Sequence, residues 1–118
     1  MWFVLIIGFF LPTSATPETV LARYHVREGR TAQLLEAVRQ HWTLARRLDL
    51  VAPEPHLVFV AKDDEERPYV GEIFTWRRHD IPEHAPGELR AIWQRLEALC
   101  TAHGGHPAIE FPELQLVH

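Results

Sequence analysis

The chain has 118 residues, of which 47% are hydrophobic and 24% charged, with a formal net charge of −4. This length fits one domain, and the composition is that of an ordinary globular protein. The basic residues are scattered among acidic ones, which excludes a basic stripe for nucleic acid and a polybasic patch for a membrane surface. A single serine, Ser14, and the lack of a glycine-rich phosphate loop exclude serine hydrolases and nucleotide-dependent enzymes.

The first residues differ from the rest of the chain. Trp2 to Leu11 form a nearly unbroken apolar run, followed by a proline and small polar residues. Such a run rises only about 15 Å as a helix, half the thickness of a bilayer core, so it predicts no stable membrane span. Its length is typical of a secretory signal, although no Lys or Arg precedes it. We expect residues 1–15 to be a signal peptide, residues 16–118 to be the folded domain, and the protein to be exported; the alternative is a cytoplasmic protein.

Changes of hydrophobic period predict the first strand and the first helix. Residues 19–26 alternate with period two, which puts Tyr24 on one strand face and both Arg23 and His25 on the other. Residues 31–48 then follow the period of a helix. The apolar stripe of that helix comprises Leu34, Leu35, Val38, Trp42, Ala45 and Leu48.

Two strands follow as a hairpin across a short charged turn. Residues 56–61 form an apolar run rich in branched side chains, which predicts a strand covered on both faces. Residues 69–77 are the predicted partner strand. On this strand Glu72 shares a face with Phe74 and Trp76.

A second helix and a last strand complete the predicted elements. The apolar stripe of the helix continues through Cys100 to His103, and Gly104-Gly105 is its expected end. Residues 109–117 predict a strand, which an internal proline restricts to an edge or a bulge.

The element order βαββαβ predicts an α+β, ferredoxin-like fold, with two helices on one face of a four-stranded antiparallel sheet. Two helices cover only one face, yet the strands are apolar on both. We therefore predict a homodimer that buries the open sheet faces, with Arg23 and His25 in the seam.

The sequence resembles the antibiotic-biosynthesis monooxygenase family of dimeric α/β barrels over residues 19–117. The likeness rests on the element order, on the Arg-Glu-Gly turn before the first helix, and on FTWRRHDIPEH, residues 74–84. That stretch is similar to the family's aromatic strand ending in Trp, here Trp76, and to the irregular helix with a His after it, here His84. The resemblance implies a dimeric α/β barrel with a pocket between sheet and helices. In some members it implies oxidation of phenolic compounds by O₂ without metal or flavin, so no cofactor is expected.

Glu72, Trp76 and His84 are the candidate catalytic residues. If the Glu72 face meets the helices, burial raises the pKa of the carboxyl and makes it a general base; the alternative is an exposed carboxylate paired with an Arg. His84 is the second candidate for the proton transfer, and Trp76 is either a pocket wall or ordinary core. The substrate-binding candidates are the aromatic residues Tyr24, Phe74, Trp42 and Trp93.

The function predicted is that of a small cofactor-independent monooxygenase-like protein acting on an aromatic or quinol-type molecule. The haem-degrading branch of the family uses an Asn on the first strand, whereas this chain has Ala22 there and contains no Asn. The alternative is a non-catalytic exported dimer that binds a small apolar ligand.

One cluster, Cys100-x2-His103-x2-His106, has metal-like spacing. Cys100 and His103 would share a helix face, but a structural zinc site normally takes four ligands and no fourth is evident. We therefore predict no metal site and expect a buried Cys beside a His at a helix end.

Overall fold

The structure is a computed structural model that describes residues 15–112, 114 and 117. The predicted signal peptide, residues 1–15, lies almost wholly outside this described part. No helix in the described part is both long and apolar enough to cross a membrane. The elements in chain order are β1 (Glu18–Tyr24), α1 (Thr31–Arg47), β2 (Leu57–Lys62), β3 (Pro68–Trp76), the 3₁₀ helix η1 (Ile81–His84), α2 (Gly87–Ala98) and β4 (Ile109–Glu110).

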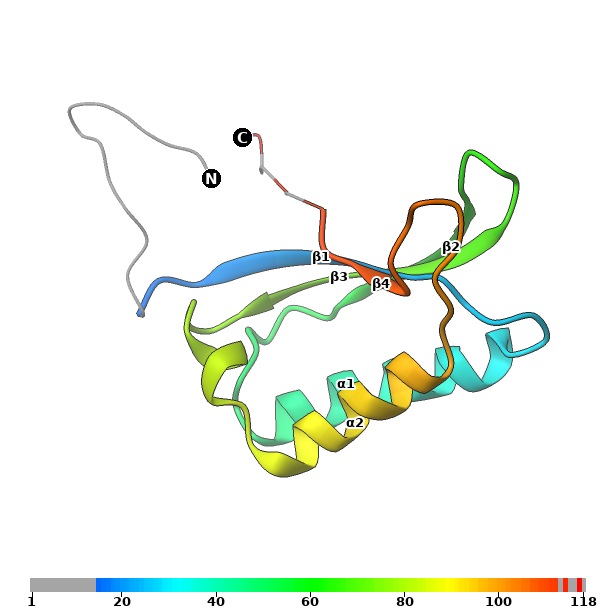
Figure 1. The fold of residues 1–118 in the computed structure, drawn as a ribbon. Coiled ribbons are helices and arrows are strands. Elements are labelled where there is room, and N and C mark those ends of the chain that lie inside the picture. The colour runs from blue at the N-terminus through cyan, green and yellow to red at the C-terminus, as the bar shows by residue number, and fades with distance from the viewer. Residues whose placement is uncertain (1–14, 113, 115–116, 118) are drawn as a thin grey trace.

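The strands form one antiparallel sheet in the order β2-β3-β1-β4, and both helices lie on the same side of it (Figure 1). This is the predicted ferredoxin-like α+β arrangement. The central pair is β1 and β3, with Ala22 opposite Glu72 and Tyr24 opposite Val70. Tyr24 and Glu72 are therefore diagonal neighbours on the helix-facing side of the sheet, within reach of each other.

The core lies between this sheet face and the two helices. β3 buries its alternate residues, including Glu72, Phe74 and Trp76, as the period of two predicted. The buried face of α1 is rotated from the predicted stripe, because Leu35 is 36% exposed whereas His41 is buried. The buried residues of α1 are Leu34, Ala37, Val38, His41, Leu44 and Ala45.

β2 is an edge strand, and the prediction that both its faces are covered is wrong for the single chain. Leu57, Val58 and Val60 are 63%, 39% and 54% exposed. The reason is that α1 packs against α2 and β3, which leaves the outer strand uncovered. Phe59 lies over β3 instead, where a Cβ on Gly71 would come within 2.2 Å of its ring.

α2 ends at Ala98, five residues before the predicted end at His103. The chain beyond it returns to the sheet, where Cys100 forms a β-bridge with Val26 and the Thr101 N–H donates to the His25 carbonyl at 2.8 Å. These bonds to β1's extension replace the helical ones, so Cys100 and His103 share no helix face.

Gly104 and Gly105 form the turn of a small hairpin rather than a helix end. Their φ values are 51° and 85°, and His103 and His106 pair across them as an antiparallel bridge. Two consecutive positive φ values are typical of a two-residue hairpin turn and strongly favour glycine. β4 follows at the sheet edge as predicted, but only over Ile109–Glu110, and part of the predicted strand 109–117 lies outside the described residues.

Candidate functional site

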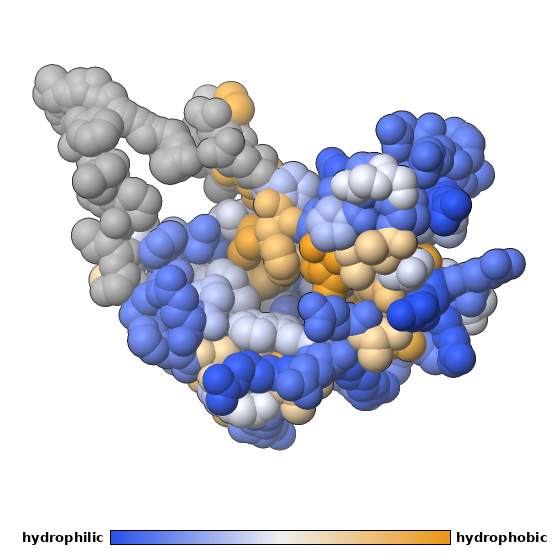
Figure 2. All heavy atoms as spheres, in the orientation of Figure 1, coloured by the Kyte–Doolittle hydropathy of each residue, from blue (hydrophilic) through white to orange (hydrophobic). Residues whose placement is uncertain are grey.

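A cleft of about 770 Å³ opens between the sheet and α2. Figure 2 shows this side of the molecule hollowed, with apolar side chains gathered in the middle and hydrophilic ones around them. The volume is in the range of pockets that bind small organic molecules. Its sheet side carries Val20, Tyr24, Phe74 and Trp76, and its helix side carries His41 and Trp93.

Behind Tyr24 and His41 lies the carboxylate of Glu72, which has no exposed surface. Its Oε1 accepts a hydrogen bond from the Tyr24 hydroxyl at 2.8 Å, and its Oε2 accepts one from His56 Nδ1 at 2.8 Å. The Nδ1 atom of His41 lies 3.5 Å from Oε1. A carboxylate offers only acceptors, so Tyr24 and His56 donate to it, and His41 Nδ1 faces it at a longer distance. Glu72 is thus the centre of a buried polar network.

The pKa of Glu72 is lowered from its ordinary 4.5 to about 2. Burial raises this pKa, but the contacts from His41, His56 and Tyr24 outweigh it. The prediction of a raised pKa is therefore wrong, and so is the alternative of an exposed carboxylate paired with an Arg. An anion so well stabilised is a weak proton acceptor, which assigns Glu72 the role of a fixed negative charge rather than a general base.

Tyr24 stays protonated beside this charge. Burial, and then the negative charge of Glu72, raise the pKa of the phenol well above its ordinary 10.0. Tyr24 lines the cleft while donating its hydrogen to Glu72. Its oxygen remains available to accept a hydrogen bond from a bound molecule.

His41 connects Glu72 to the cleft through a defined tautomer. The indole Nε1–H of Trp93 donates to Nε2 of His41 at 3.0 Å. Since an indole nitrogen only donates, Nε2 carries the lone pair and the ring proton sits on Nδ1, which faces Glu72. This is the orientation in which a carboxylate prepares a histidine to act as a base.

Aromatic rings surround this pair. Phe74 and Trp76 meet edge to face with centroids 4.9 Å apart, and Trp76 meets Trp93 at 6.3 Å. Trp42 lies behind the network, where it stacks on His56 with centroids 4.8 Å apart. Trp42 therefore braces a partner of Glu72, and it does not line the cleft.

The structure brings most of the predicted site together, but it leaves His84 outside. His84 is exposed in η1 and does not line the cleft. Sequence reasoning missed His41 and His56. His41 had a detectable signal, because it lies on the apolar side of the helix three residues after Val38. His56 had none, since its partner on β3 is 16 residues away.

Residues able to hold a metal lie away from the cleft. In the described part of the chain two groups of His, Asp and Glu have donor atoms close enough to share an ion, and both contain His25. Neither includes a cleft residue or Cys100. Burial raises the pKa of the Cys100 thiol to about 12, so this cysteine is an inert core residue.

No family model matches the chain, and no curated protein matches it. Solved structures do. A Bacteroides thetaiotaomicron protein provisionally named an antibiotic biosynthesis monooxygenase aligns with a TM-score of 0.61 at 9% identity, over 90% of this chain and 94% of that one. SnoaB from Streptomyces nogalater, a cofactor-independent oxygenase, aligns with a TM-score of 0.58 at 18% identity, over 86% and 95%. Rv0793 from Mycobacterium tuberculosis aligns with a TM-score of 0.59 at 12% identity, over 87% and 97%.

Identities this low establish a common fold and carry no statement about activity. The matched structures extend over nearly the full described chain, as the sequence resemblance did. The chain therefore has the α+β fold of the antibiotic biosynthesis monooxygenases, which confirms the predicted fold class.

Proposed function

We propose that this chain is a cofactor-independent monooxygenase-like protein that acts on an aromatic or quinol-type small molecule. The observation that carries the proposal is the Glu72–His41 pair at the wall of an apolar, aromatic-lined cleft. A carboxylate held anionic behind a neutral imidazole is an arrangement for removing a proton. SnoaB, whose fold this chain shares, is a cofactor-independent oxygenase, so the fold is able to accommodate such chemistry.

In the proposed reaction the substrate ring packs against Phe74 and Trp76, and its hydroxyl reaches His41. Nε2 of His41 takes the proton in place of its bond from Trp93, and Glu72 stabilises the imidazolium through Nδ1. The electron-rich anion then passes an electron to O₂. One oxygen atom replaces two hydrogens on a ring carbon to give a carbonyl, and the other leaves as water. The substrate supplies all the electrons, so the balance closes without a further reductant.

His41→Gln tests the base. The substrate is dithranol, a phenolic anthrone, and the uncatalysed rate of O₂ uptake is subtracted. We expect the remaining, protein-dependent rate to fall by about 100-fold or more, because a positioned general base contributes about 10²–10⁴-fold. An oxygen electrode measures the rate, and near-ultraviolet circular dichroism checks the fold. His79→Gln, which changes an exposed histidine outside the cleft, is the matched control. Full activity in His41→Gln would remove the base assignment.

His84→Ala separates the structural assignment from the sequence prediction. Because His84 is exposed and does not line the cleft, we expect its removal to leave O₂ uptake near the wild-type rate. If His84→Ala lost as much O₂ uptake as His41→Gln, the proton transfer would be assigned to His84 instead.

A non-catalytic, ligand-binding role is the second candidate. It is favoured by the fact that both Glu72 oxygens and the Trp93 indole already have partners inside the chain. In that case wild-type protein binds dithranol, seen as quenching of tryptophan fluorescence, without consuming O₂.

We also propose that the chain forms a homodimer through the open face of the sheet. Leu57 and Ile73 are paired neighbours on β2 and β3 and point away from the helices, and Leu57 is 63% exposed. Arg23 lies on the same face over the Tyr69 ring, at 5.5 Å. Exposed apolar sheet surface of this kind is typical of an interface. His25, which was predicted in the seam, is instead enclosed within its own chain at 1% exposure.

Ile73→Asp should convert the dimer to a monomer, because each interface would bury an unpaired carboxylate from both copies. Size-exclusion chromatography with light scattering measures the mass. Leu35→Asp, on the outer surface of α1 at 36% exposure, is the control and should leave the mass unchanged. A wild-type chain that is already monomeric contradicts the proposed dimer.

A further inference from the structure

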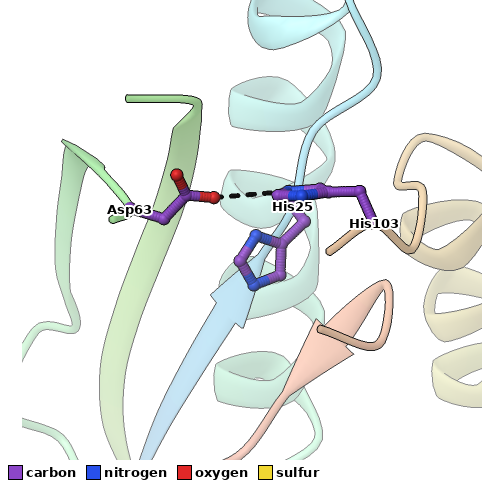
Figure 3. A group of neighbouring side chains, drawn as sticks. All are labelled: His25, Asp63 and His103. Carbon is purple, nitrogen blue, oxygen red and sulfur yellow. Dashed lines mark ion pairs between the residues drawn. The ribbon is translucent and has the colours of Figure 1, made fainter. Parts of the chain in front are cut away.

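Three side chains from distant segments meet beside the end of β1, away from the cleft. His25 directly follows β1, Asp63 directly follows β2, and His103 lies beyond α2 (Figure 3). One donor atom from each lies within 4.8 Å of the other two. His25 is 1% exposed, and the side chains of Asp63 and His103 are 6% and 10% exposed.

Buried polar atoms without a hydrogen bond are concentrated in this group. Such atoms in the described part of the chain are His25 Nδ1, Asp63 Oδ2, His103 Nδ1 and, elsewhere, His41 Nδ1. A buried polar atom without a partner costs about 1–3 kcal/mol. Two of these atoms, His25 Nδ1 and Asp63 Oδ2, face the centre of the group, where one ligand would satisfy both.

The surrounding hydrogen bonds orient His25 toward the centre of the group. Its Nε2 lies 2.5 Å from Glu110 Oε1, and a carboxylate can only accept, so the ring proton sits on Nε2. The neutral ring then has its lone pair on Nδ1, the buried atom without a partner. A histidine that ligates a metal typically donates its other N–H to a carboxylate or carbonyl in this way.

Asp63 is oriented in the same sense by the turn between β2 and β3. Its Oδ1 accepts the backbone N–H groups of Glu65 and Arg67 at 2.8 and 3.0 Å, which leaves Oδ2 free. Oδ2 lies 3.3 Å from Nε2 of His103, the ion pair drawn in Figure 3. Two ligands of one tetrahedral zinc, with bonds of about 2.0–2.1 Å, lie about 3.3 Å apart.

His103 reaches this position because of the hairpin turn that follows it. Gly104 brings the turn close to the β2–β3 turn, where a Cβ on Gly104 would come within 2.5 Å of Glu65 Oε1. Glu65 Oε1 in turn lies 3.3 Å from Nδ1 of His103, on the ring nitrogen that does not face Asp63. Both histidines therefore have a carboxylate behind the ring and the common centre in front.

We propose that His25, Asp63 and His103 bind a Zn²⁺ ion that fastens the end of β1, the β2–β3 turn and the segment beyond α2 to one another. Two imidazoles and one carboxylate are the nitrogen and oxygen ligands that Zn²⁺ takes, and a water completes the tetrahedron. Hard ions such as Mg²⁺ and Ca²⁺ prefer an all-oxygen set. The site goes beyond the proposed oxygenase function and does not depend on it. The sequence cluster thus contained one true ligand, His103, while Cys100 belongs to the core.

A neighbouring group, His25 with His106 and Glu110, competes for the same histidine. Its donor atoms are already satisfied, because Glu110 accepts from His25 Nε2 and from His106 Nδ1 at 3.0 Å. Glu110 and His106 therefore orient the His25 ring. The atoms without a hydrogen bond, His25 Nδ1 and Asp63 Oδ2, belong to the group with Asp63 and favour that group as the metal site.

Full-length protein stripped with EDTA and titrated with ZnSO₄ by calorimetry tests the site. We expect one Zn²⁺ per chain, a higher melting temperature with Zn²⁺ than with EDTA, and no comparable response to Mg²⁺ or Ca²⁺. Co²⁺ in place of Zn²⁺ should give the visible absorption bands of a tetrahedral nitrogen and oxygen site.

Asp63→Asn and His103→Gln should each weaken Zn²⁺ binding by more than about 100-fold, beyond the 10–100-fold that loss of a supporting residue causes. Asp63→Asn keeps an oxygen for the two backbone bonds, so the turn stays formed. His79→Gln should bind as the wild type does. No Zn²⁺ binding, an equal response to Mg²⁺, or unchanged binding in both variants would overturn the proposal. Loss of binding in His106→Gln but not in Asp63→Asn would also overturn it.

Discussion

Glu72→Gln should lower the free energy of unfolding by about 3 kcal/mol at neutral pH. The estimate follows from the lowered pKa of Glu72, about 2 against an ordinary 4.5, since each unit is worth about 1.4 kcal/mol. Gln keeps the volume of the side chain, so the loss reports the charge and its hydrogen bonds to Tyr24 and His56 rather than a cavity. Chemical unfolding in urea, followed by tryptophan fluorescence, measures it.

The same change should alter how stability depends on pH. The folded pKa of Glu72 is below the ordinary value, so its contribution is fully present above pH 4.5 and is lost as pH falls toward about 2. The stability difference between wild type and Glu72→Gln should therefore shrink over this acidic window. Glu36→Gln, which changes an exposed acid of α1, is the control and should change stability little. A difference that stays constant into acid would contradict the assignment.

Trp76→Ala should destabilise the fold by about 3–5 kcal/mol, the usual cost of removing a large buried aromatic side chain. Trp76 is 4% exposed, meets the rings of Phe74 and Trp93, and forms a backbone bridge with Val51. Its removal opens a void between the sheet and α2 at the base of the cleft. Urea unfolding measures the loss.

Phe111→Ala is the matched control for this prediction. Phe111 also lines the cleft, but it is 65% exposed at the rim. We expect it to weaken dithranol binding while changing stability by less than about 1 kcal/mol, because little packing is lost. If Trp76→Ala were as stable as Phe111→Ala, Trp76 would be a lining residue without a part in the core.

Taken together, these changes separate structural from chemical roles at one site. Glu72 and Trp76 support the fold whatever the cleft does, so their variants report first on stability. His41→Gln preserves much of the packing and reports on proton transfer. The buried carboxylate is costly to enclose, and its hydrogen bonds from Tyr24 and His56, with His41 close by, are what make it tolerable in so small a domain.

Local sequence patterns specify the order of the elements and the residues that share each strand face. Alternation with period two places Glu72, Phe74 and Trp76 on one side of β3, and the charged turn makes β2 and β3 a hairpin. These features depend on residues close together in the chain, so local periodicity is sufficient to predict them.

The partners that those faces contact come from distant parts of the chain, and local patterns do not predict them. His41 and His56 reach Glu72 from α1 and from the segment before β2, and their contacts reverse the pKa shift that burial alone predicted. Likewise, Asp63 and His103 meet His25 only because the chain beyond α2 pairs with the end of β1 instead of continuing as a helix. Periodicity identifies the face on which a side chain lies, but the partner opposite that face comes from a distant segment, and that partner sets the charge and the chemistry.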